Sequence, residues 1–223
     1  IPTPILTSSG KAILKLGKKN LWVYNKIQGK MIKKVNINQF KQIAKALAIF
    51  HKYTKDFKWK AENDKKHFYW MLKELEKMKK IKPKNNADMA MLRSIDFFIE
   101  TWKKINKVKF RKKQLIHGDF SNSNVIFNQN KLVGIIDFDN LEMNSKIRDV
   151  ALAIKRTDFF SMSLSKEKIE VFLKEYRKIS SFTKKQEKLL VPAIIKDNCG
   201  IFWWAYNRLI KNRTRRLSFL RWP

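Results

Sequence analysis

Three carboxylates and several asparagines lie close together in residues 115–140, whose sequence is LIHGDFSNSNVIFNQNKLVGIIDFDN. Asp119 follows a short apolar run, Asn124 comes five residues later, and Asp137 ends a second apolar run. Carboxylate and amide oxygens are hard ligands of the kind that Mg²⁺ favours, with phosphate and water oxygens completing its coordination shell. A carboxylate beside such an ion suits a second task, which is to accept or orient the proton of an attacking hydroxyl group.

The spacing of these residues predicts that they converge. The β-prone runs 124–127 and 132–136 are separated by the polar sequence NQNK, which favours a hairpin turn. In such a hairpin Asn124 and Asp137 lie at the same end, with Asp119 on the loop beside them. We therefore expect Asn124 and Asp137 to bind Mg²⁺ and Asp119 to orient a hydroxyl group. The alternative is a polar cluster of turns, without chemistry, in an α+β domain.

The elements that must position this segment come in a segregated order. Residues 2–29 are expected to form strands, with a hairpin turn at SSGK. Apolar residues at helical spacing then predict helices over residues 38–57, 62–80 and 87–107. A short strand is expected at 114–117, and the chain returns to helix after Arg148. This order predicts an α+β fold rather than a regular βαβ alternation.

Three local signals predict where helices begin. Either Asn36 or Asn38 is expected to cap the first helix. The pattern Thr183-x-x-Gln186 is that of a capping box. Pro192 is expected to kink or delimit the last helix, because proline lacks the backbone N–H of a helix interior.

The sequence HGDFSNSN followed by IIDFDN resembles the H-x-D-x-x-x-x-N loop and the metal-binding aspartate of protein-kinase-like folds. The closer resemblance is to the aminoglycoside phosphotransferase-like superfamily, which includes the aminoglycoside, choline and homoserine kinases and spore-coat kinase homologues. Further segments resemble it in the same order, so that the resemblance covers nearly the whole chain. These segments are PTPILTSSGKAILKLGKKNLWVYNKIQG, AKALAIFHKYTKDF, IRDVALAI and FLKEYRKISSFTKKQEKLL.

The resemblance implies a role for each residue of the site. It implies that Asp119 is the catalytic base or the residue that orients the hydroxyl, and that Asn124 and Asp137 bind the metal ion. It also implies that His117 braces the loop and that Asp149 accepts hydrogen bonds from the loop's backbone.

The resemblance implies a protein-kinase-like fold in two parts. Residues 1–28 correspond to partial N-lobe strands and the hinge, and residues 29–223 to a mostly helical C-lobe with a small β insert. The hinge residues, which meet adenine mainly through backbone groups, are Tyr24, Asn25, Lys26 and Ile27.

The segment before the hinge departs from the pattern of such kinases. Only 23 residues precede Tyr24, and they contain no Gly-rich loop to cover phosphates. No lysine among them is assigned the role of the strand lysine that pairs with a helix glutamate. We expect that the first half of the N-lobe is absent from this sequence, because the chain starts at Ile1 in mid-lobe. A degenerate relative is the alternative.

Composition limits the partners and the location. The net charge is +31, from 50 Lys and Arg against 19 Asp and Glu, with lysine spread over the whole chain. Such a charge reflects either a lysine-rich composition or a polyanionic partner, namely nucleic acid or an anionic surface. The single cysteine excludes an internal disulfide and fits the reducing cytoplasm. No apolar run approaches the roughly 18 residues that span a bilayer.

These features together predict an ATP-dependent kinase of small molecules that uses Mg²⁺. It would transfer the γ-phosphoryl group to a hydroxyl, with an amino alcohol or a homoserine-like molecule as the first choice of acceptor. The region after Asp137 lacks the Ala-Pro-Glu element of a protein-kinase activation segment, which argues against a protein substrate. The alternative is a catalytically degenerate pseudokinase or a basic module that associates with nucleic acid.

Overall fold

The computed structural model describes residues 2–58, 73, 75–110, 113–157 and 165–206. The chain forms two compact units. The first unit contains Ile1–Tyr53, His117–Leu141 and Leu152–Ser181, and the second contains Thr54–Ile116, Glu142–Ala151 and Phe182–Pro223. The division into kinase lobes at residue 28 is a different one, and it stays a prediction.

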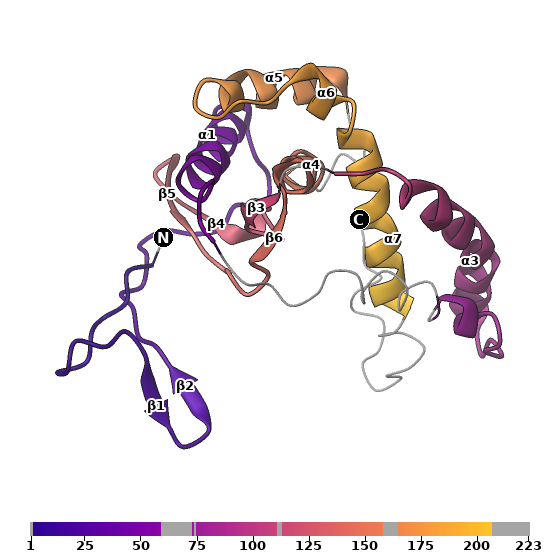
Figure 1. The fold of residues 1–223 in the computed structure, drawn as a ribbon, viewed down its shortest axis with the longest axis horizontal. Coiled ribbons are helices and arrows are strands. Elements are labelled where there is room, and N and C mark those ends of the chain that lie inside the picture. Colours follow the sequence, from indigo (N-terminus) through magenta and orange to yellow (C-terminus); the bar gives the residue numbers. More distant parts are fainter. Residues whose placement is uncertain (1, 59–72, 74, 111–112, 158–164, 207–223) are drawn as a thin grey trace. The chain divides into compact units, whose positions relative to one another are not determined.

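The N-terminal segment of the first unit is a narrow β-ribbon, drawn in indigo in Figure 1. β1 (Leu14–Leu16) and β2 (Lys19–Leu21) pair antiparallel. The turn expected at residues 8–11 is confirmed, because the N–H of Gly10 donates to the carbonyl of Thr7 over 2.9 Å. The strands are shorter than expected, and outside β1 and β2 an isolated bridge joins Pro4 to Tyr24.

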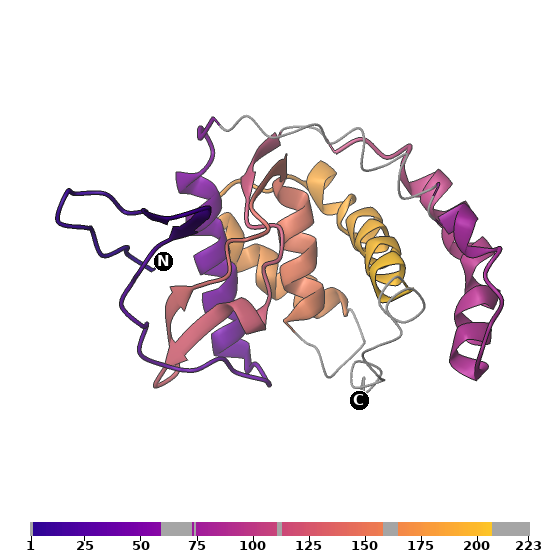
Figure 2. The same ribbon diagram turned by 90° about the horizontal axis from the view of Figure 1, so that it is seen from below.

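Helix α1 (Ile37–Tyr53) confirms the first predicted helix. Its apolar stripe is buried, including Ile43 and Leu47 with no exposed surface. Asn36 is the cap, because its Oδ1 accepts from the N–H of Gln39 while Gln39 Oε1 accepts from the N–H of Asn36. α1 packs side by side with α5 (Lys166–Arg177), as Figures 1 and 2 show.

The predicted hairpin is also confirmed, as β4 (Val125–Asn128) and β5 (Lys131–Ile135). Its two turn residues, Gln129 and Asn130, have φ angles of 43° and 64°, as in the turns whose twist matches paired strands. Helix α1 holds this hairpin through Gln42. Gln42 Nε2 donates to the carbonyl of Asn130 over 2.8 Å, and Gln42 Oε1 accepts from the N–H of Leu132 over 2.9 Å.

The second unit contains a strand that the sequence did not predict. β3 (Lys113–Ile116), which was expected, pairs antiparallel with β6 (Glu142–Ser145). The sequence of β6 is EMNS, which carries no β-branched or aromatic residue and therefore no strand signal. Helix α4 (Lys146–Arg156) follows β6 directly and contributes its residues from Leu152 onward to the first unit.

Helices α3 (Asn86–Ile105) and α7 (Leu190–Tyr206) contact each other in the second unit. Their core contains Ile95, Ile99, Trp102 and Cys199. α3 confirms the third predicted helix. Of the second, Leu75–Met78 are helical, and most of its length lies outside the described residues.

The structure also decides the two remaining predictions about where helices begin. Thr183 forms the expected capping box at the start of α6 (Lys184–Glu187). Pro192 lies in the first turn of α7 and so delimits that helix rather than kinking it. Within the described residues, no helix is both long and apolar enough to cross a membrane.

Candidate functional site

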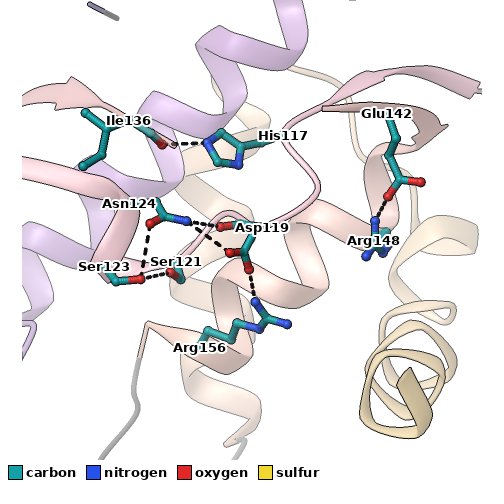
Figure 3. Close-up of polar contacts among 9 residues, drawn as sticks. All are labelled: His117, Asp119, Ser121, Ser123, Asn124, Ile136, Glu142, Arg148 and Arg156. Carbon is teal, nitrogen blue, oxygen red and sulfur yellow. Dashed lines mark hydrogen bonds and ion pairs between the residues drawn. The ribbon is translucent and has the colours of Figure 1, made fainter. Parts of the chain in front are cut away.

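Asp119 lies in the loop between β3 and the short 3₁₀ helix η1 (Asn122–Asn124), and groups of the first unit hold it (Figure 3). Asn124 Nδ2 donates to the backbone carbonyl of Asp119 over 2.7 Å, and lies 3.4 Å from Asp119 Oδ2. The other carboxylate oxygen, Oδ1, forms an ion pair with Arg156 at the end of α4. The side chain of Asp119 remains 31% exposed, so a small molecule can reach it.

Asn124 connects this loop to the open end of the β4–β5 hairpin. Its carbonyl accepts from the N–H of Ile136 over 3.0 Å, directly beyond the pairing of Val125 with Ile135. Its side-chain oxygen accepts weakly from Ser123 Oγ, at 3.4 Å. The residue is buried, which limits its side chain to few orientations.

His117 ties the start of the same loop to Ile136. Its ring is fully buried, and Nε2 donates to the carbonyl of Ile136 over 3.1 Å. Because a carbonyl can only accept, the hydrogen-bond network assigns the ring proton to Nε2. The rings of Phe120 and Phe138 pack against the imidazole, with centroids 5.4 and 5.0 Å away. These contacts are those of a side chain that braces a loop.

Asp137 follows Ile136, whose two backbone groups are thus held by Asn124 and His117. Asp137 is exposed and has a φ of 63°, a left-handed conformation that aspartate tolerates better than most residues. The structure therefore places the backbone of Asp137 next to the hairpin end that Asn124 joins to the Asp119 loop. That the three side chains meet there stays a prediction.

Gly118 forces the turn that presents Asp119. Its φ is +81°, and a Cβ built on it would lie 2.0 Å from the carbonyl oxygen of Asn140. Sequence reasoning did not single out this glycine, although a left-handed turn between His117 and Asp119 is a role typical of glycine.

The four expected hinge residues also belong to the first unit. Tyr24, Asn25 and Lys26 are exposed, whereas Ile27 is half-buried against Gly134 of β5. A Cβ on Gly134 would lie 2.5 Å from Ile27 Cδ1, so the side chain of Ile27 fills the space over the strand.

The chain just after the hinge docks on the same hairpin and loop. Lys30 and Phe127 exchange two backbone hydrogen bonds, of 2.9 and 3.0 Å. Asn122 Nδ2 donates to the carbonyl of Ile32 over 2.9 Å. The hinge and the loop of Asp119 are therefore positioned by one hairpin.

Asp149 is the one expected site residue that does not belong to the first unit. It is fully buried in the first turn of α4 and belongs to the second unit. Its expected contact with the loop backbone stays a prediction.

The donor set fits Mg²⁺ that shares its shell with a nucleotide. Among the described residues, no group of three or more His, Cys, Asp or Glu could hold a metal ion. Asn124 and Asp137 instead offer one amide and one carboxylate at the hairpin end. Two protein oxygens with phosphates and water are a usual arrangement for Mg²⁺, which keeps several waters.

The family model described as "Phosphotransferase enzyme family" matches residues 22–185. This range includes every hinge and site residue named above. No curated protein sequence matches the chain significantly.

Solved structures share the fold at low identity. An aminoglycoside phosphotransferase from Alicyclobacillus acidocaldarius is 16% identical with a TM-score of 0.75, and the match covers 99% of this chain and 70% of that one. An amicoumacin kinase in complex with AMP-PNP and Ca²⁺ is 18% identical with a TM-score of 0.68, over 98% of this chain and 68% of that one. The ethanolamine kinase of Plasmodium vivax is 17% identical with a TM-score of 0.63, over 95% and 64%. These matches confirm the kinase-like α+β fold.

Proposed function

Because the chain belongs to the phosphotransferase enzyme family, we propose that it transfers the γ-phosphoryl group of ATP to a hydroxyl group of a small molecule. One observation carries the proposal: hydrogen bonds of Asn124 join the Asp119 loop to the hairpin end that Asp137 follows. A base and two oxygen ligands at one place are what phosphoryl transfer requires of this part of a kinase, since it depends mainly on positioning and charge neutralisation.

Asp119 orients the acceptor and receives its proton. Its half-exposed carboxylate accepts a hydrogen bond from the acceptor hydroxyl, which aligns the hydroxyl oxygen with the γ-phosphorus. The new bond forms between these two atoms, and the bond from the γ-phosphorus to the β–γ bridging oxygen breaks. ADP leaves with the bridging oxygen, and the hydroxyl proton passes to Asp119.

The other residues position the reactants. Asn124 and Asp137 would hold Mg²⁺, which when bound neutralises charge on the phosphates. His117 keeps the loop against Ile136, and Asp149 is proposed to support the loop backbone. Backbone groups of residues 24–27 are proposed to meet adenine, with the docked Ile27 fixing their distance from the hairpin.

An amino alcohol or a homoserine-like molecule is the proposed class of acceptor. The neighbour named as an ethanolamine kinase supports testing amino alcohols first. The strongly basic chain, at +31, offers little attraction to polycationic aminoglycosides.

The test is a screen of the full-length protein with ATP and Mg²⁺ against amino alcohols, sugars and aminoglycosides. We expect acceptor-dependent release of ADP, with the largest rate for an amino alcohol. Binding of Mg²⁺–ATP without ADP release in any class would instead indicate a pseudokinase. Absence of nucleotide binding would reject both the kinase and the pseudokinase.

A further inference from the structure

We propose that Arg156 is a positioning residue that fixes the carboxylate of Asp119, so that Oδ2 is the oxygen offered to the acceptor hydroxyl. The inference rests on the proposed function and adds to it a residue that no sequence motif marks. Arg156 lies 37 residues from Asp119 and meets it through the fold alone.

The two oxygens of Asp119 differ in their contacts (Figure 3). Oδ1 is engaged by the guanidinium of Arg156. Oδ2 has one weak contact, at 3.4 Å, with Asn124 Nδ2, which makes its shorter hydrogen bond of 2.7 Å to the Asp119 backbone. Each carboxylate oxygen has about two acceptor positions. Oδ2 therefore keeps the capacity to accept a hydroxyl hydrogen.

The end of α4, which carries Arg156, is firmly packed. Arg156 is the last residue of α4, and the preceding Leu152, Ala153 and Ile154 are buried with at most 2% exposure. The N–H of Thr157 still donates to the carbonyl of Ala153 over 3.1 Å, so the backbone around Arg156 is ordered. A cation at the C-terminal end of a helix is also favourable, because the helix dipole is negative there.

The ion pair acts on orientation. Without it, the carboxylate can rotate and present either oxygen in several directions, and a reacting group that is displaced by about 1 Å can cost about 100-fold in rate. The planar fork of arginine restricts this rotation, whereas the ammonium of lysine acts as a point charge and restricts it less.

The test compares Arg156→Ala and Arg156→Lys with the wild-type full-length protein. We expect Arg156→Ala to lower kcat by about 10- to 100-fold, with the KM for ATP nearly unchanged. Arg156→Lys should recover part of this loss. Guanidinium chloride, at concentrations far below those that unfold proteins, should restore part of the kcat of Arg156→Ala.

Arg148→Ala is the matched control. Arg148 lies on the same helix and also forms an ion pair, but with Glu142 instead of Asp119. We expect its kcat to stay near wild type and to show no response to guanidinium. A structural effect of losing any arginine ion pair on α4 would lower both variants alike and would not be rescued.

Crystal structures of wild type and Arg156→Ala test the inference without an activity measurement. We expect one orientation of the Asp119 carboxylate in the wild type and a changed or divided one in the variant. An unchanged carboxylate, or an unchanged kcat in Arg156→Ala, would overturn the inference. A wild-type protein that is inactive on every acceptor would overturn the proposed function, while the carboxylate orientation still decides the role of Arg156.

Discussion

Asp119 is held by two side chains of its own chain, and this distinguishes it from the other carboxylates of its segment. Asn124 holds its backbone and Arg156 holds Oδ1, while the side chain stays partly accessible. Asp139, twenty residues later, is exposed on a turn. Asp139 is therefore a suitable control for Asp119, because only Asp119 is held in place by the side chains described above.

Asp119→Asn tests the base directly. The amide oxygen can still accept a hydrogen bond but cannot take up a proton, so kcat should fall by about 100- to 10,000-fold. The affinity for Mg²⁺–ATP, measured by calorimetry, should stay close to wild type because the proposed ligands are intact. Asp139→Asn is the control and should keep its turnover. Near-normal turnover of Asp119→Asn would refute the assignment.

Gly118→Ala tests the turn that presents Asp119. The new Cβ would meet the carbonyl of Asn140 at 2.0 Å, in a backbone conformation with φ of +81°. Gly10→Ala is a matched control, because Gly10 has a φ of +75° but no atom within 4 Å of a Cβ. Gly10→Ala should lower the free energy of unfolding by about 1–2 kcal/mol. Gly118→Ala should lower it further and also reduce kcat, and equal losses in denaturant melts would contradict the clash.

Sequence predicts an element well when its buried face appears as a regular spacing of apolar residues. α1 and α3 carry a clear apolar stripe, and the stripe is buried in the structure. β6 could not be predicted, because its pairing with β3 is backbone to backbone and its sequence EMNS has no strand pattern. Arg156 could not be predicted either, because only the fold brings the end of α4 to the loop.

The docking of the hinge on strand β5 gives a prediction about nucleotide binding. Gly134→Ala would place a Cβ 2.5 Å from Ile27 Cδ1, so the side chain of Ile27 must leave its place over β5. We expect the KM for ATP to rise by up to about tenfold, which corresponds to 1.4 kcal/mol. Adding Ile27→Ala should relieve the clash and recover part of the affinity. Gly200→Ala, at a helix position with no atom within 4 Å, should leave the KM unchanged.

The packing of α1 on α5 contains a buried carboxylate, Glu175. Its pKa is lowered, mainly by the hydrogen bond from Lys178 at 2.7 Å, while burial opposes this and Lys45 at 3.5 Å adds to it. A lowered pKa in the folded state stabilises the protein above the ordinary glutamate range, and this stabilisation is lost as the pH falls through the folded-state pKa.

Glu175→Gln should therefore be less stable than wild type at neutral pH. The difference in thermal midpoint should shrink as the pH falls below the ordinary glutamate range, because the wild-type carboxylate then becomes protonated. Glu170→Gln, at an exposed pair with Lys166, is the control and should show little difference at any pH. A difference for Glu175→Gln that is independent of pH would indicate lost packing rather than lost charge.

For the molecule as a whole, the resemblance to a known family was more informative about function than the composition was. The paired motifs indicated the family, and the family model confirms it over residues 22–185. The charge of +31 has two explanations, which are a lysine-rich composition and a polyanionic partner. An excess of lysine spread over the whole chain then has one general consequence, which is self-repulsion of the folded state.

Salt should therefore stabilise the protein. The screening length falls from about 30 Å at 0.01 M to about 10 Å at 0.1 M ionic strength, so repulsion between distant lysines weakens most in this range. We expect the thermal midpoint to rise steeply between these concentrations of NaCl and to level off above them. Sucrose at equal osmolality is the control, because it stabilises without screening charge. A midpoint that is flat or falls with NaCl would mean that nearby carboxylates already balance the lysines, as Glu76 and Asp96 do for Lys79.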